Sequence, residues 1–461
     1  MQAPFDIAAD LDTPVSAYLK LGALRPRFLL ESVEGGERLA RYSFLGFGDA
    51  LEVRMDTDGL HINGATQARP LDQQQYLDAL RAALAAAPRP GPEVAGLPFA
   101  GGLVGVSGYD VVRLFEKLPR DTVAQGRIPD AAFVAPASLL VFDHLTRRVA
   151  LLHDGPEAER KALRSDVIRL LRGAVPAGNG KSTTSAPEAS FSEQEFCKRV
   201  AACQEYIASG DIYQIVLSVL FRGRSNVAPF EVYRALRLLN PSPYMFFLEF
   251  GDLKVVGSSP EALVKLSGDK ASLRPIAGTL PRGANTEQDT ANAAALLADP
   301  KEAAEHVMLV DLARNDLGRV AAAGSVHVEP YRAIERYSHV MHIVSGVQGK
   351  LANGYDQFDL FAASFPAGTL VGAPKVRAME IIEEMETVGR GLYAGTAGYF
   401  GLSGDMDQAI TIRTLVFSGD EYSYQAGAGI VADSVPENEY REVLAKSAIL
   451  RRALEMAGEG L

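Results

Sequence analysis

The stretch that most limits how this chain can fold lies at residues 173–193 and reads GAVPAGNGKSTTSAPEASFSE. A run so rich in Gly, Ser, Thr, Ala and Pro favours a flexible linker or a long surface loop. The sequence therefore predicts an N-terminal lobe at 1–172 and a second domain at 194–461. The total of 461 residues is long for a single hydrophobic core, which agrees with more than one lobe.

Composition and charge narrow the class of protein. Hydrophobic residues make up 47% of the chain and charged residues 22%, which is typical of a soluble globular protein. No apolar run approaches the roughly 20 residues that span a bilayer, and the start MQAPFDIAADLDTP lacks a signal-peptide pattern. We therefore expect a cytoplasmic protein without a membrane partner. The net charge of −11 argues against a nucleic-acid partner, and two cysteines, Cys197 and Cys203, provide no disulfide framework.

Apolar periodicity predicts a mixture of helices and strands. Before residue 173, RVALLHD and SLLVFD are typical of strands, and VIRLLRGA closes a helix. In the second domain, IYQIVLSVLF predicts a strand, and FGDLKVVGSS predicts two strands joined by a turn. Helices are predicted for FCKRVAACQEYIASGD, for DTANAAALLADPKEAAEHVMLVDLARND with an interruption near Pro300, and for PENEYREVLAKSAILRRALEMAG after Pro436.

The segment RPIAGTLPRG at 274–283 is predicted to be a shaped turn. Two prolines and two glycines in ten residues exclude a long helix and weaken a strand. It follows the strand candidate KASL and carries two arginines, so we expect an exposed backbone with positive charge close by.

Two glutamates on predicted helices are candidate metal ligands. Glu305 lies in EAAEHVMLVD, and Glu442 lies in ENEYREVLAKS. Most helical glutamates only face solvent, whereas Mg2+ prefers a few carboxylate oxygens together with waters and substrate oxygens. Spacing alone does not show that the two side chains meet, so a solvated surface and a magnesium site both stay open.

Two of the seven histidines fall in ERYSHVMHIVSG. If this segment is a strand, the period of two residues places His339 and His342 on opposite faces. One of them could then act as a general acid near neutral pH while the other is structural.

Glycine recurs beside small polar residues in FPAGTLVGAPK (365–375), YAGTAGYF (393–400) and QAGAGIVADS (425–434). Glycine lets backbone N–H groups approach an oxyanion, although turns between strands would have the same composition. Together with RPIAGTLPRG and Arg413, these segments predict a pocket for a small polyanion, because arginine pairs bidentately with carboxylates. The residues alone thus indicate a magnesium-using enzyme that acts on a small anionic metabolite.

The order of the long motifs resembles the chorismate-utilising enzymes, and among them the large synthase subunits (component I) of anthranilate synthases. The motifs are DIYQIVLS, VGSSPEALVK, RPIAGTLPRG, KEAAEHVMLVDLARNDLGRV, ERYSHVMHIVS, FPAGTLVGAPKVRAMEII, AITIRT and QAGAGIVADSVPENEY. The similarity covers 195–461 and continues in DLDTPVSAYLKL and FLLESVEGGERLARYSFLG. It implies an α+β fold of two interleaved lobes, in which helices surround a large antiparallel β-sandwich core.

The family's residue roles transfer to matching positions. Glu305 and Glu442 match two Mg2+ ligands, with the metal bridging to the ring carboxylate of the substrate. His342, rather than His339, matches the histidine that helps the hydroxyl group depart, and Glu261 matches the acid/base glutamate beside that carbon. The other matching positions are Arg413 and Tyr393 at the enolpyruvyl carboxylate, with Gly278, Thr279, Thr369, Gly427, Gly429 and Lys446 around the same site.

Two positions distinguish members of the family by the chemistry they allow. Isochorismate and salicylate synthases carry a lysine where this chain has Gln214, and a neutral amide cannot replace that base in activating water. Aminodeoxychorismate synthases commonly carry a nucleophilic lysine at the position of Ala277. The resemblance therefore favours attack of ammonia on chorismate followed by loss of pyruvate, which gives anthranilate. Two alternatives stay open: a synthase that forms aminodeoxychorismate or aminodeoxyisochorismate, and an inactive regulatory subunit that binds tryptophan.

Two short motifs resemble the halves of a tryptophan feedback site. They are LLES, with Leu30, Glu31 and Ser32, and NPSPYM, with Pro243, Tyr244 and Met245. A ligand bound between lobes can hold an active site in a poor geometry. LLES is equally compatible with a strand edge in the core.

The chain contains no G-x-C-x-G nucleophile of a glutamine-hydrolysing domain. The resemblance therefore implies a hetero-oligomer in which a separate glutamine amidotransferase subunit (component II) supplies ammonia. Leu280 and Val371 depart from the family pattern, which usually has an arginine and a small hydroxyl residue at these positions.

Overall fold

The structure is a computed structural model that describes residues 4–32, 41–126, 128–176, 182–336 and 340–461. His339 and residues 177–181 of the expected linker lie outside these ranges. The helices within them are α1 (Pro14–Lys20), α2 (Gln73–Ala85), α3 (Glu157–Leu171), α4 (Glu193–Ala208), α5 (Pro229–Leu239), α6 (Thr286–Ala298), α7 (Pro300–Gly318), α8 (Gln357–Ser364), α9 (Lys375–Met385) and α10 (Pro436–Glu459), with the short 3-10 helices η1 (Gly22–Leu24), η2 (Tyr109–Leu114) and η3 (Gly368–Leu370).

Most of the described strands belong to one large curled sheet, and every pairing between named strands is antiparallel. Its strands are β1 (Ile7–Ala8), β2 (Pro26–Glu31), β3 (Tyr42–Asp56), β4 (Gly59–Ile62), β5 (Ala65–Gln67), β6 (Gly102–Ser107), β7 (Ala131–Asp143), β8 (Arg148–His153), β9 (Glu188–Ala189), β10 (Gln214–Arg224), β11 (Tyr244–Phe250), β12 (Leu253–Ser259), β13 (Ala262–Ser267), β14 (Lys270–Leu273), β16 (His327–Val328), β19 (Val347–Lys350), β20 (Gly372–Ala373), β21 (Thr396–Gly401), β22 (Met406–Ile410), β23 (Thr414–Ser418) and β24 (Glu421–Ile430). A small separate sheet contains β15 (Ile276–Pro281), β17 (Ala333–Arg336) and β18 (Val340–Val344).

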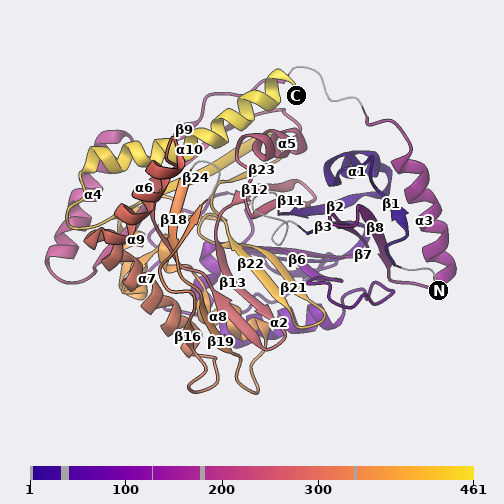
Figure 1. The fold of residues 1–461 in the computed structure, drawn as a ribbon, viewed down its shortest axis with the longest axis horizontal. Coiled ribbons are helices and arrows are strands. Elements are labelled where there is room, and N and C mark those ends of the chain that lie inside the picture. The colour runs from indigo at the N-terminus through magenta and orange to yellow at the C-terminus, as the bar shows by residue number, and fades with distance from the viewer. Residues whose placement is uncertain (1–3, 33–40, 127, 177–181, 337–339) are drawn as a thin grey trace.

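The large sheet joins the two halves of the chain. Strand β2 pairs with β11, and β6 pairs with β21, so segments more than 200 residues apart lie side by side. In Figure 1 the dark strands of the N-terminal half interleave with the orange and yellow strands of the C-terminal half. The mixed α+β fold with interleaved lobes and an antiparallel core is therefore confirmed.

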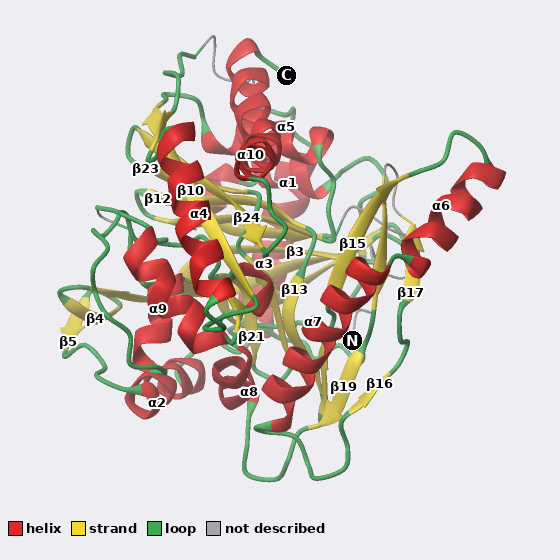
Figure 2. Cartoon of the chain, turned by 90° about the vertical axis from the view of Figure 1, so that its left-hand side faces the viewer, coloured by secondary structure: helices red, strands yellow, loops and turns green. Residues whose placement is uncertain are grey.

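Helices cover the outside of this sheet, and two of them position the site. Helix α10 packs on α4, α5 and β24, while α7 packs on β15, β19 and α8 (Figures 1 and 2). Both begin at a proline, whose ring fixes the backbone for the first helical turn. The side chain of Asp299 caps α7 by accepting bonds from the N–H groups of Lys301 and Glu302. The interruption predicted near Pro300 is thus the boundary between α6 and α7.

The prediction of a turn at 274–283 is wrong. Residues 276–281 form strand β15, which pairs with β18 along its length. The register shifts between Ala277 and Thr279, and Gly278 lies between them with a φ of 66°. A single glycine in the left-handed region accommodates this bulge, so the glycines and prolines did not prevent pairing.

Two further segments differ from the expectation drawn from their composition. QAGAGI is not a loop, because residues 425–430 are the last part of β24 and pair with β10. The expected linker also enters the sheet, since β9 pairs with β10 at Phe221 and Arg222. Small residues are compatible with strands where a neighbouring backbone or side chain approaches closely.

The remaining predicted elements occur close to their expected positions, including α4, β10, the β11–β12 pair and α10. Both cysteines are free, as expected. Among the helices of the described ranges, none is both long enough and apolar enough to cross a membrane.

Candidate active site

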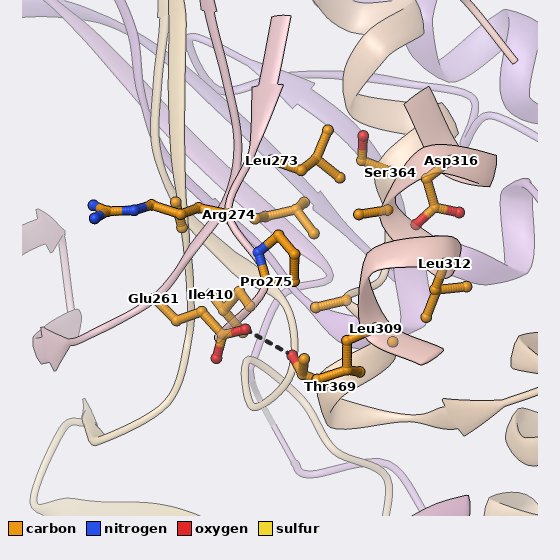
Figure 3. A pocket seen from close by; sticks show the side chains of 15 residues that line it. Glu261, Leu273, Arg274, Pro275, Leu309, Leu312, Asp316, Ser364, Thr369 and Ile410 are labelled. Atoms are coloured by element: carbon orange, nitrogen blue, oxygen red, sulfur yellow. Dashed lines mark hydrogen bonds between the residues drawn. The ribbon is translucent and has the colours of Figure 1, made fainter. Parts of the chain in front are cut away.

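Glu261 and Thr369 form one corner of the candidate site. Glu261 lies between β12 and β13, directly before Ala262. Thr369 lies in η3, and its hydroxyl donates a hydrogen bond of 2.9 Å to Glu261 Oε1. Burial raises the pKa of Glu261 to about 7, and this hydrogen bond and the charges of Lys446 and Arg413 partly oppose that rise. Figure 3 shows this contact beside a cavity of about 50 Å³. A carboxyl group with this pKa can give or take a proton at neutral pH.

His342 lies on β18 opposite Thr279 of β15. Its Nδ1 is 3.1 Å from the carbonyl oxygen of Gly278 and 3.0 Å from Thr279 Oγ1. Because a carbonyl oxygen only accepts, Nδ1 carries the proton in the contact with Gly278. Burial lowers the pKa of His342, and the Gly278 carbonyl only partly opposes this shift, so the imidazole is neutral at pH 7. His339 lies outside the described residues, so the structure does not compare the two histidines.

Gly278 also brings a carboxylate into this corner. A Cβ atom at Gly278 would lie 2.9 Å from Glu302 Oε2, so the missing side chain makes room for Glu302 of α7. Glu302 was missed by the sequence analysis. Its spacing from Glu305, three residues along the same helix, is a signal that could have found it.

Gln214, the first residue of β10, connects this corner to the sheet. Its Nε2 donates a hydrogen bond of 3.4 Å to Glu305 Oε1. A Cβ atom at Gly429 would lie 2.8 Å from the same nitrogen, and one at Gly427 would lie 2.7 Å from Tyr393 Oη. These two glycines of β24 therefore make room for side chains of the site, while the expected binding of an oxyanion by their N–H groups stays a prediction.

Lys446 on α10 closes the arrangement on the other side. Its Nζ donates a hydrogen bond of 3.0 Å to the carbonyl oxygen of Gly427 and lies 2.6 Å from Glu442 Oε1. Arg413 lies beyond β22 with a φ of 49°, and its charge acts on both Glu261 and His342. All the catalytic, substrate-binding and metal-binding candidates thus fall in one connected region between α7, α10, β10, β24 and the small sheet.

Two pairs of acids face this region. Burial and the neighbouring Glu305 raise the pKa of Glu302, and burial and the neighbouring Glu442 raise the pKa of Glu439. The charge of Lys301, on the first turn of α7, acts on Glu439, so the ends of α7 and α10 lie near one another. Within the described ranges, no three acidic, histidine or cysteine side chains come close enough together to hold a metal ion by themselves.

The two departures from the family pattern lie in apolar surroundings. Val371 is fully buried in the main core, and Leu280 packs on a small cluster that contains Leu296 and Met341. Both side chains therefore stabilise the packing around η3, which carries Thr369, and β15, which carries Thr279.

A second cavity, of about 220 Å³, brings LLES and NPSPYM together. All six predicted residues line it: Leu30, Glu31, Ser32, Pro243, Tyr244 and Met245. LLES is also a core strand, because β2 pairs with β11 through Leu30 and Phe246. Sequence reasoning missed the rest of the lining, which includes Lys265, Ala397, Gly398, Tyr399 and Asp407. These residues come from strands distant in sequence, and only the sheet topology places them here.

Comparisons with known proteins agree along nearly the whole chain. Residues 25–452 match the family model described as chorismate binding enzyme. The chain is 45% identical to anthranilate synthase component 1 of Thermus thermophilus over 98% of this chain and 97% of that protein. It is 43% identical to the protein of the same name from Neisseria meningitidis, over 99% and 95%.

Solved structures give the same result. The crystal structure of anthranilate synthase component I from Streptococcus pneumoniae superposes with a TM-score of 0.81 at 35% identity, over 98% of this chain and all of that one. The menaquinone-specific isochorismate synthase from Escherichia coli superposes with a TM-score of 0.70 at 20% identity, over 95% and 91%, which shows a shared fold.

Proposed function

The chain belongs to the chorismate-binding enzymes, and we propose that it is the synthase subunit of an anthranilate synthase, which converts chorismate and ammonia to anthranilate and pyruvate. The reaction also releases one molecule of water, so that all atoms balance. It would be a lyase reaction and the first step toward tryptophan. The near full-length similarity to proteins of that name supports this assignment.

The observation that carries the proposal is the neutral amide of Gln214 beside Glu305. An amide cannot remove a proton from water, so a weak nucleophile would not be activated at this position. Ammonia needs no such activation, because its free base already attacks an electrophilic carbon. Ala277 supports the same assignment, because it is buried and its methyl group provides no covalent nucleophile.

Glu261 and His342 would serve the proton transfers that remain. Hydroxide is a poor leaving group, so departure of the ring hydroxyl requires a proton donor. Glu261, with a pKa of about 7, can supply that proton and release water. His342 is neutral, with its Nδ1 held by the Gly278 carbonyl, which fixes the orientation of its ring. Arg413, Lys446 and Tyr393 would bind the anionic groups of chorismate.

The acid pairs fit a Mg2+ ion. Burial and the charges of Glu305 and Glu442 raise the pKa values of Glu302 and Glu439, and a divalent cation between the two helix ends would offset the charge of each pair. Glu305 and Glu442, with Glu302 and Glu439 beside them, would supply hard oxygen ligands from two separate pairs, and substrate oxygens and waters would complete the coordination. The ion would offset the charge of the substrate's ring carboxylate.

We also propose that tryptophan binds the 220 Å³ cavity as a feedback inhibitor. Apolar groups such as Leu30 and Met245 could contact an indole ring, while Glu31, Lys265 and Asp407 provide charges for an amino acid's ends. Tyr244 lies opposite Ser259 in the β11–β12 pair, two residues before Glu261, so the cavity and the site share two strands. Ammonia would come from a separate glutamine amidotransferase subunit.

The test is to incubate the purified chain with chorismate, Mg2+ and ammonium, and to follow anthranilate fluorescence and pyruvate release together. We expect both anthranilate and pyruvate to form, and we expect the formation of both to slow when tryptophan is added. Consumption of chorismate without pyruvate would instead identify an aminodeoxychorismate-type synthase. Binding of tryptophan without any turnover, with or without an added glutaminase subunit, would identify an inactive regulatory subunit.

A further inference from the structure

Arg390 is the largest fully buried side chain among the residues that the structure describes, and the proposed chemistry does not use it. Its guanidinium is paired with Glu386, with Nε 3.0 Å from Oε2 and Nη2 2.7 Å from Oε1. Only 1% of the Arg390 side chain and 3% of the Glu386 side chain are exposed. Burying an ion pair is costly, so a purely structural position would be filled as well by apolar residues. What the guanidinium contacts therefore matters.

The same guanidinium holds two backbone segments of the site. Its Nη1 donates a hydrogen bond of 2.7 Å to the carbonyl oxygen of Leu370, the residue that follows Thr369. Its Nη2 donates another of 2.7 Å to the carbonyl oxygen of Val216, two residues after Gln214 on β10. The N–H of Val216 in turn donates to the carbonyl oxygen of Val371. The η3 turn and the start of β10 are thus fixed relative to each other.

The ion pair also contacts the other two walls of the site. Arg390 lies over the ring of Tyr393, 5.7 Å from its centre, and its carbonyl oxygen accepts the N–H of Tyr393. Glu386 accepts hydrogen bonds from both the N–H and the hydroxyl of Ser218, which pairs with Gly427 of β24. Four elements that carry site residues therefore meet at one buried charge pair.

We propose that Arg390 is a positioning residue of the chorismate site, which sets the η3 turn against β10 so that the Thr369 hydroxyl reaches Glu261. Arg390 is not in contact with Glu261 or Thr369 and acts on them through Leu370, Val216 and Tyr393, which it contacts directly. A planar guanidinium can donate in several fixed directions at once, and neither lysine nor an apolar side chain reproduces this geometry. The inference rests on the proposed function.

The test uses the pH profile of kcat/KM, because a loss of packing alone would not move it. The Thr369 hydrogen bond lowers the pKa of Glu261, so a displaced η3 turn raises that pKa. The other groups that face Glu261 or its cavity stay in place: Lys446, Arg413, Arg274, which points toward Glu335, and Asp316, which is paired with Lys375. The limb of the pH profile near pH 7, where kcat/KM changes as Glu261 ionises, should therefore move upward by roughly half to one pH unit in Arg390→Lys. The kcat of this variant should fall by at least about tenfold.

Two comparisons make the result specific. Thr369→Val should shift the limb by a similar amount, and the double variant with Arg390→Lys should shift it no further, because both act through one hydrogen bond. Arg113→Lys is the matched control, since Arg113 forms a largely buried pair with Glu383 of α9 and its side chain bonds to Asp110, Pro119 and Glu383, none of them a site residue named above. It should lower the melting temperature without moving the limb.

The outcomes are distinguishable. If the unsubstituted chain does not turn over chorismate, the proposed function fails before the variants are measured. If the unsubstituted chain is active but the limb of a folded Arg390→Lys variant stays unchanged, or its shift adds to that of Thr369→Val, the positioning role is wrong. Should Arg390→Lys not fold, Glu386→Gln keeps the guanidinium but removes its charge partner. That variant should give a smaller shift in the same direction, and an unmoved limb would overturn the proposal.

Discussion

The amide nitrogen of Gln214 lies 3.4 Å from a carboxylate oxygen of Glu305, so strand β10 and helix α7 meet at a hydrogen bond between a neutral group and an acid. The two residues are 91 positions apart in the sequence. This contact places a side chain without basic character beside the carboxylates that we propose as metal ligands. Under the proposed function, the choice between water and ammonia as nucleophile depends on Gln214, and substitution of that residue tests this.

Replacing Gln214 with lysine should change the product. The ammonium group would pair with Glu305, and in its neutral form it could remove a proton from water. We expect ammonia-dependent formation of anthranilate to fall at least about tenfold, and a hydroxylated isomer of chorismate to accumulate. Chromatography of the reaction mixture measures both. Gln214→Leu is the control, because it removes the amide without adding a base and should give no hydroxylated product.

Replacing Glu261 with glutamine should remove the proton donor and stabilise the fold at high pH. Loss of a general acid lowers kcat by about 10²- to 10⁴-fold. Burial favours the neutral carboxyl, so the folded chain pays for ionising Glu261 as the pH rises from about 4.5 through 7.

At pH 8 the free energy of unfolding should therefore be larger for the glutamine variant than for the unsubstituted chain, by roughly 1–3 kcal/mol. The difference should vanish below about pH 4.5. Denaturant unfolding at both pH values checks this, and an equal difference at pH 4 and pH 8 would show that burial does not raise this pKa.

Removal of divalent cations should abolish turnover, and added Mg2+ should restore it. Glu302→Gln and Glu439→Gln should each weaken Mg2+ binding by roughly 10- to 100-fold, since each removes a charge from a hard-oxygen site. Calorimetric titration of Mg2+ in the presence of a chorismate analogue measures the affinity. Glu287→Gln, in the first turn of α6, is a suitable control because this acid lies outside both pairs. Unchanged affinity in both site variants would place the metal elsewhere.

Filling the 220 Å³ cavity should remove the response to tryptophan. A ligand that binds only the folded state stabilises it, by about 2.7 kcal/mol when the ligand concentration is about 100 times Kd, and so raises the melting temperature. Leu30→Trp places an indole ring at the cavity wall, so added tryptophan should no longer shift the melting temperature. Leu238→Trp adds the same bulk on the exposed face of α5 and should keep the shift. A normal shift in Leu30→Trp would exclude this cavity as the binding site.

Much of the fold could be predicted because local signals and tertiary structure agree. Pro300 and Pro436 fix the first turns of α7 and α10, and apolar periodicity marks β10 and the β11–β12 pair. The prediction of a turn for RPIAGTLPRG was wrong because the pairing of this segment with β18 outweighs the weak local preference of its glycines and prolines. Strand propensity depends on the neighbouring strand, and the partners of β15 on β18 lie 59 to 68 positions away, from the Pro281–Val340 pair to the Ile276–Val344 pair.

The candidate site shows the same division. The resemblance gave the positions that motifs mark, and the structure brings them together. Glu302 and Glu439 carry a weaker signal, a spacing of three residues from a predicted ligand on each helix. Arg390 carried no signal in the sequence, because an arginine is expected at the surface unless its partners are known. Its partners are Glu386 and the carbonyl oxygens of Leu370 and Val216, which only the structure brings together around it.

The pairing of β2 with β11 and of β6 with β21 has a consequence for dividing the chain. Neither 1–172 nor 194–461 can satisfy its own strand edges, and an isolated half would expose unpaired backbone that promotes aggregation. If the gene were split between these regions, the two polypeptides would have to be synthesised together and associate while folding. Their reassembly would restore the 220 Å³ cavity at the same time, because each fragment supplies one wall of it.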